Sequence, residues 1–187
     1  MKRTTLLLLM PLACASLGLA DWALPQTGSP PTWQTQKITD DVRSISFTRF
    51  TLAGQFTASP GQAANRPALV VDCIPGDSAG SKGKLLVSSL QVGTKLKVVY
   101  VEPEEIHAMS YYPKVAVQLR TDDASQGDEN WSPGTDNMSI SVGKESLKKI
   151  LRAHSASITA SDEHGSPLAM RFDLSDSKPI ENACNLD

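Results

Sequence analysis

Carboxylates are the residues of this chain whose type and spacing best suit chemistry, and the densest group comprises Asp122, Asp123, Asp128 and Glu129. Clustered carboxylates can coordinate calcium or transfer protons. If Asp122 begins a calcium loop, Gly127 takes the sixth position, but Pro133 stands where a bidentate Glu belongs. An EF-hand is therefore excluded, whereas an irregular calcium site and a solvated hairpin loop both remain open.

Aromatic residues lie in and near the acidic stretch at 122–136. Trp131 lies within it, and Tyr111 and Tyr112 precede a predicted strand at 115–119. Exposed Trp and Tyr side chains stack on sugars and anchor protein partners. With the acids they predict a candidate binding surface, and the alternative is that they fold back over the edge of the sheet.

Other catalytic and metal-binding patterns are missing from the sequence. His107, His154 and His164 are widely spaced, so they do not form the close pairs that zinc sites use. Ser146 and Lys149 match a Ser-x-x-Lys pattern, but they fall on a predicted amphipathic helix, and we interpret the match as coincidence. We predict no catalytic residue, no metal and no cofactor.

The N-terminus predicts export. Lys2 and Arg3 precede an apolar run and small residues ending at Ala20, which is typical of a cleaved signal peptide over residues 1–20. The run is far shorter than the ~20 residues of a membrane-spanning helix, which argues against a retained anchor. Cys14 offers a second possibility, because a lipid on this cysteine would tether the domain to a membrane. We therefore expect a periplasmic or secreted protein that contacts a membrane only if Cys14 is lipidated.

Charge and cysteine content indicate which partners and which compartment suit this protein. Without Lys2 and Arg3, 16 basic residues remain against 20 acidic ones, a net charge of −4. A mildly acidic surface argues against a nucleic-acid partner. Cys73 and Cys184 most simply form one disulfide in an oxidising compartment, and two free buried thiols are the alternative.

Alternating apolar residues predict the fold. Residues 21–37 are rich in Pro, Gly, Ser, Thr and Gln and predict a flexible lead-in, in which Trp33 is the first candidate for packing. Residues 38–187 then form a single domain, with period-2 strands near these apolar sets: Ile45/Phe47, Phe50/Leu52, Leu69–Cys73, Leu96–Tyr100, Val115–Leu119, Met138–Val142 and Leu168–Leu174. A change of parity between the first two sets predicts a bulge near Arg49.

Two short helices complete the prediction. Leu147, Ile150 and Leu151 form an apolar stripe over 144–153, and Pro179 begins a second turn that ends at Cys184. Strands with one apolar face bury that face well when two sheets stack. The predicted fold is therefore mostly β: an antiparallel β-sandwich with one or two short α-helices, closed by one disulfide.

The order of several short motifs resembles a known family. An Ile-Thr-Asp-Asp-Val start at 38–42 is followed by a strand ending at Cys73. Arg120-Thr121-Asp122 comes next with Trp131 nine residues on, and a Phe172 strand leads to Cys184. This order is similar to the type VI secretion-associated TagO/VasI family of small exported envelope proteins. The resemblance implies an accessory role without catalytic residues, and with envelope or secretion-system proteins as partners.

Three functions follow as hypotheses. The first is a non-enzymatic exported envelope accessory or binding protein, associated with a secretion system. The alternative is a carbohydrate- or calcium-dependent surface-binding module that uses Trp131 and the 122–136 acidic stretch. A cell-wall hydrolase is the third, and no motif supports it.

Overall fold

The computed structural model describes residues 32–42, 44–58, 66–76, 85–101 and 111–184. The predicted signal peptide, Cys14, most of the lead-in and His107 lie outside these ranges. Within them the predicted fold class is confirmed: antiparallel strands dominate, with two short helices and a Cys73–Cys184 disulfide. No helix in the described ranges is long and apolar enough to cross a membrane.

The described strands follow one continuous hydrogen-bonded path that folds over on itself, and its first half, β1-β2-β4-β5-β9, forms what we call the first sheet. Their bounds are β1 Gln34–Asp40, β2 Ile45–Ala53, β4 Ala68–Ile74, β5 Leu85–Gln91 and β9 Ser139–Ser141. β1 begins at Gln34, four residues before the expected boundary at 38, and Trp33 packs against the core just before it.

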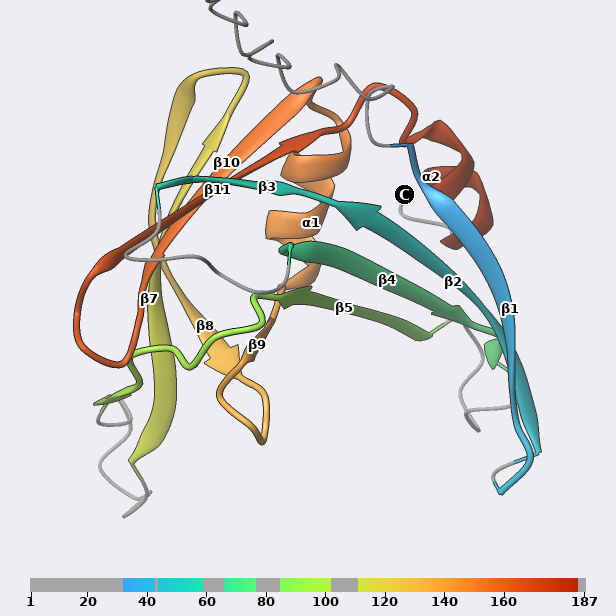
Figure 1. Ribbon diagram of the computed structural model, residues 1–187. Helices are drawn as coiled ribbons and strands as arrows, with labels where there is room; N and C mark the ends of the chain where they lie inside the picture. The colour runs from blue at the N-terminus through green and yellow to red at the C-terminus, as the bar shows by residue number, and fades with distance from the viewer. Residues whose placement is uncertain (1–31, 43, 59–65, 77–84, 102–110, 185–187) are drawn as a thin grey trace, which may run out of the picture.

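The second sheet follows the order β8-β7-β10-β11-β3. Its strands are β3 Gln55–Ala58, β7 Tyr112–Thr121, β8 Ala124–Pro133, β10 Ser155–Ser161 and β11 Pro167–Asp173. A short strand, β6 (Val99–Val101), pairs with the beginning of β7. Figure 1 shows the two sheets facing each other, with β7 and β8 on one side and β1, β2 and β4 on the other.

Two connections join the sheets at opposite edges. β8 pairs with β7 in the second sheet and with β9 in the first. At the other edge β2 and β3 are separated only by Gly54, so the chain leaves the first sheet and enters the second without a loop. A Cβ atom at Gly54 would lie 2.5 Å from a ring carbon of Phe172, and glycine is therefore what lets the ring fill this corner.

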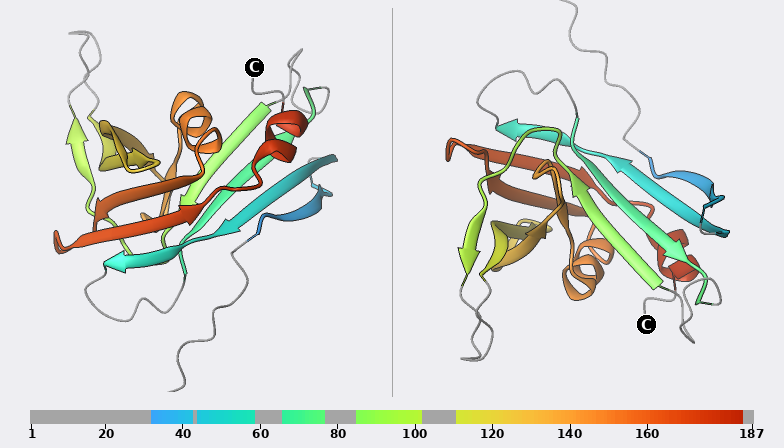
Figure 2. Two further views of the ribbon diagram at one scale, coloured as in Figure 1. Left: turned by 90° about the horizontal axis from the view of Figure 1, so that it is seen from above. Right: turned by 90° about the horizontal axis from the view of Figure 1, so that it is seen from below.

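The core lies between the sheets and is completed by the two helices. α1 (Lys144–Leu151) lies between the sheets in Figures 1 and 2 and buries Leu147, Ile150 and Leu151. Glu145 in its first turn and Lys148 and Lys149 in its last match the helix dipole. α2 (Lys178–Cys184) lies against β4, where Cys184 bonds to Cys73 with Cα atoms 5.1 Å apart.

Several expected elements differ from the structure. β2 pairs in regular register with both neighbours, so the predicted bulge near Arg49 is wrong. The apolar residues change parity because Phe47 faces outward, whereas Phe50 and Leu52 face the core. On the outer face the Arg49 guanidinium lies 5.7 Å from the centroid of the Phe47 ring. Bulges occur instead between Leu119 and Arg120 and between Ala169 and Met170.

The acidic loop expected over 122–136 is also wrong, because β8 occupies most of it. Asp122 and Asp123 alone form the turn, with φ of 47° and 65°. Positive φ at both central residues is the signature of a type I′ hairpin turn, which returns the chain at once into the next strand. Asp tolerates this conformation better than most residues do.

Candidate functional site

Glu129 lies at the centre of the most connected polar cluster of the described residues. It faces the interior from β8, and its Oε2 accepts hydrogen bonds from Trp131 Nε1 at 2.7 Å and from Ser146 Oγ. Lys149 Nζ lies 3.5 Å from its other carboxylate oxygen. Ser146 and Lys149 share one face of α1 because they are three residues apart. The carboxylate thus binds α1 to the second sheet.

This cluster holds Glu129 as an anion. Burial alone would raise the pKa of its carboxyl, but the bonds from Ser146 and Trp131 and the charge of Lys149 outweigh burial, and the pKa lies below its ordinary value. A carboxylate with a lowered pKa is a poor proton acceptor. Ser146 and Lys149, the two residues of the Ser-x-x-Lys pattern, therefore both contact the Glu129 carboxylate, which is suited to holding the helix rather than to activating Ser146.

Asp122 has an equally local role at the hairpin turn. Its Oδ1 accepts hydrogen bonds from the backbone N–H groups of Ser155 and His154, both at 2.9 Å. These bonds, the one from Ser155 above all, lower the pKa of the Asp122 carboxyl. His154 Nδ1 lies 3.7 Å away, on an exposed ring. Asp122 thereby fixes the beginning of β10 against the end of β7.

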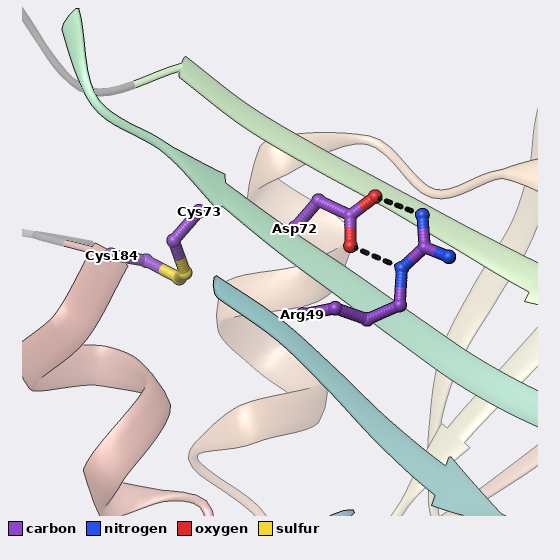
Figure 3. Close-up of a disulfide and its surroundings, with 4 residues drawn as sticks. All are labelled: Arg49, Asp72, Cys73 and Cys184. Atoms are coloured by element: carbon purple, nitrogen blue, oxygen red, sulfur yellow. Dashed lines mark hydrogen bonds and ion pairs between the residues drawn. A yellow bond between two sulfur atoms is a disulfide. The ribbon is translucent and has the colours of Figure 1, made fainter. Parts of the chain in front are cut away.

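Arg49 and Asp72 form a bidentate ion pair on the outer face of the first sheet (Figure 3). Their two hydrogen bonds measure 2.7 and 2.8 Å, and the residues lie directly opposite each other on β2 and β4. The bond to Asp72 raises the pKa of Arg49. Because Asp72 is nearly buried, the pair compensates a carboxylate that neighbouring strands have partly removed from water.

The structure does not bring the predicted binding residues together. Trp131 is buried, with 4% of its surface exposed, so of the two alternatives for this residue the structure shows the packed one. Glu129 faces inward beside it, whereas Asp128 faces outward, because neighbouring strand residues point to opposite faces. In the described ranges no three His, Cys, Asp or Glu side chains lie close enough to hold a metal ion.

Tyr111 and Tyr112 lie elsewhere, at an exposed strand pair that we call the aromatic strand pair. It consists of Val99, Tyr100 and Val101 of β6 with Tyr111 and Tyr112. Tyr100, Tyr111 and Tyr112 are 70%, 61% and 50% exposed. Figure 1 shows this pair at the lower left, extending away from the rest of the molecule.

A second surface feature lies on the outer face of the second sheet, where β7, β8 and β10 enclose a groove of about 350 Å³. Its outward side chains are Ala116, Gln118, Asp128, Asn130, Thr159 and Ser161. We call it the sheet groove. Only Asp128 was a sequence candidate. The outward parity of β7 was readable in the sequence, but the opposing positions on β8 and β10 were not, because neither strand was predicted.

The residues that carry the family resemblance have structural roles here. Cys73 and Cys184 are bonded, Trp131 and Phe172 are in the core, and Arg120 donates a 3.0 Å hydrogen bond to the carbonyl oxygen of Asp123. Such residues specify a fold and leave the function to be found at the surface.

Comparisons with models of known protein families, with curated proteins and with solved structures found no match for this chain. The resemblance to the TagO/VasI family therefore remains a prediction from the sequence.

Proposed function

We propose that this protein is a non-enzymatic, exported accessory protein of the cell envelope that binds a partner protein through the aromatic strand pair. The observation that carries the proposal is the concentration of exposed apolar side chains there. Of the eight exposed large hydrophobic residues found in the described ranges, five belong to this pair: Val99, Tyr100, Val101, Tyr111 and Tyr112. Apolar patches of this kind mark interaction surfaces, and tyrosine is frequent among the residues that dominate binding energy.

The geometry of the pair supports a protein partner. Val101 lies opposite Tyr112 and shares its face, while Tyr100 lies opposite Pro113 on the other face. The pair is therefore apolar on both faces, and a two-stranded ribbon cannot cover both by itself. Among the described strands β6 pairs only with β7, which leaves its second edge with backbone groups that can pair with another chain.

Two features support a place in the envelope. The signal-like N-terminus predicts export, and disulfides such as Cys73–Cys184 persist in oxidising compartments. The periplasm or the extracellular space is accordingly the proposed location. The resemblance to the TagO/VasI family suggests that the partner belongs to a type VI secretion machine.

Site-specific photo-crosslinking in the native host tests the proposal. A photoreactive amino acid replaces Tyr100, and in a matched control it replaces Gln36, an exposed residue of β1. We expect one defined envelope protein to be crosslinked from position 100 and not from position 36, and Y112S to reduce its yield by about tenfold or more. Equal products from the two positions, or a yield that Y112S leaves unchanged, would contradict the proposal.

A further inference from the structure

We propose that the sheet groove is a binding site for a neutral carbohydrate, independent of the aromatic strand pair and of calcium. The hollow has a simple origin. Ala116 on β7 lies opposite Asn130 on β8, and Ser161 extends from β10 on the other side. Because Ala116 on the central strand is small, a depression forms between the polar side chains on the two neighbouring strands. Its volume, about 350 Å³, is at the small end of the range for small-molecule sites.

The polar side chains of the groove are available for a ligand. Gln118 lies opposite Asp128 on one neighbouring strand and opposite Thr159 on the other, which places three hydrogen-bonding groups in a row across the sheet. Within the part of the chain that the structure describes, the side chains of Gln118, Asp128, Asn130, Thr159 and Ser161 form no hydrogen bond to another protein group. The inward Glu129, by contrast, has three partners.

The chemistry of this row selects a neutral, hydroxyl-rich ligand. Amides donate and accept, hydroxyl groups do both, and the Asp128 carboxylate accepts from ligand hydroxyl groups. No Lys or Arg lines the groove, and two cations of β7 bind protein groups instead: Lys114 donates to Ser132 Oγ at 3.0 Å, and Arg120 donates to the Asp123 carbonyl. Phosphates and other anions therefore lack a counter-charge. Ala116 and Pro167 supply the small apolar surface against which the C–H face of a sugar ring packs.

The groove also argues against a calcium-dependent site. Asp128 is the one outward carboxylate of its lining, because the neighbouring Glu129 faces the interior. Calcium takes six to eight oxygen ligands, usually with several carboxylates among them. Sugar binding at the groove should accordingly persist in EDTA.

Amide chemical-shift titration of the full mature chain tests this inference, with N-acetylglucosamine, its β-1,4-linked dimer and maltose as probes. We expect at least one of the three to shift the amide signals of Gln118, Asn130 and Thr159, in EDTA as well as in calcium. Q118A should weaken that binding by about five- to tenfold, the loss expected for one hydrogen-bonding side chain.

A pair of leucine variants separates occupancy of the groove from general effects on the sheet. A116L fills the hollow and should abolish the shifts. S157L makes a similar change on the same outer face of β10, outside the lining, and should leave them intact. No shift with any of the three sugars, shifts that survive A116L, or shifts that disappear in EDTA would each overturn the proposal. Crosslinking from position 100 should be the same in A116L, so failure of the groove proposal is distinguishable from failure of the proposed function.

Discussion

Glu129 shows how a single side chain can fix a helix on a sheet. Its carboxylate accepts from Trp131 on its own strand and from Ser146 on α1, and Lys149 of α1 balances its charge. Removing one member leaves the others with buried polar atoms, which costs more than the bond itself contributes. The cluster therefore ties the position of α1 to the ionisation of one acid.

The stability of the fold should depend on this ionisation. Because the pKa of Glu129 is lowered in the folded state, its contribution is complete above its ordinary value near 4.5 and is lost as the pH falls through the lowered value. We expect E129Q to reduce the free energy of unfolding by about 1–2 kcal/mol at neutral pH. The same variant should also flatten the decline of stability below pH 4.5. Urea unfolding across pH measures both.

Asp128 provides the matched control for this experiment. It is the preceding residue of β8, faces solvent, and forms no side-chain hydrogen bond within the described structure. D128N should leave the unfolding free energy within about 0.5 kcal/mol of the wild type, both at neutral pH and below pH 4.5. A pH profile of E129Q that matches the wild type would contradict the role given to Glu129.

Among the elements, the strand that crosses between the sheets is constrained by close packing at its corner. β2 and β3 form one path interrupted at Gly54, whose amide donates to the Pro67 carbonyl at 2.7 Å. Phe172 of β11 fills the space that a side chain at this corner would occupy. The corner therefore joins a small residue on one strand to a large one on a distant strand.

Enlarging Gly54 should disturb this corner. The Cβ atom of G54A would lie 2.5 Å from the Phe172 ring, so the ring or the backbone must move. We expect a loss of about 1–3 kcal/mol in unfolding free energy, the usual effect of overpacking a core. G143A is the comparison: a Cβ atom at Gly143 would have no neighbour closer than 3.9 Å, so this variant alters only the N-cap of α1 and should cost less, about 0.5–1 kcal/mol. Thermal unfolding of the two variants should separate them, and equal melting temperatures would contradict the packing argument.

The strands that the sequence predicted correctly are those in which large apolar residues alternate, as in β4, β7 and β11. β10 was missed because its inward residues Ala156, Ile158 and Ala160 are mostly small, which weakens the period-2 signal. β8 was missed because its inward positions include the charged Glu129, whose burial depends on Ser146 of α1, a partner 17 residues later in the chain.

The same limit applies to the candidate surfaces. Tyr111 and Tyr112 were identified because two adjacent tyrosines are visible in the sequence, and the structure shows that both are exposed. The sheet groove depends on which residues of β7, β8 and β10 lie side by side, and that register is a tertiary property. The sequence left both an exposed and a packed Trp131 open for a related reason: its indole N–H finds an acceptor in Glu129 only when both residues face the interior.

For the molecule as a whole, the disulfide joins β4 to the C-terminal helix across a sequence separation of 111 residues. Cross-linking residues so far apart restricts the unfolded chain, and the chain-entropy model gives about 4–5 kcal/mol for a loop of this length. The bond therefore represents a large share of the stability of a domain this size.

Removing the bond should be correspondingly severe. We expect the C73S/C184S double variant to lose about 2–5 kcal/mol in unfolding free energy, measured by urea denaturation. Added reductant should destabilise the wild type toward the level of the double variant and leave the double variant unchanged. A wild type that reductant does not affect would show that the bond is absent from the purified protein.

The crossing strand at Gly54 also determines when the fold can close. β3 pairs with β11, and Cys73 bonds to Cys184, so both closures need segments near the end of the chain. A chain that emerges N-terminus first will present the apolar inner face of the first sheet long before its cover exists. Neither closure can form until the last strand and helix arrive, so an unfinished chain stays open and exposes this apolar face to aggregation.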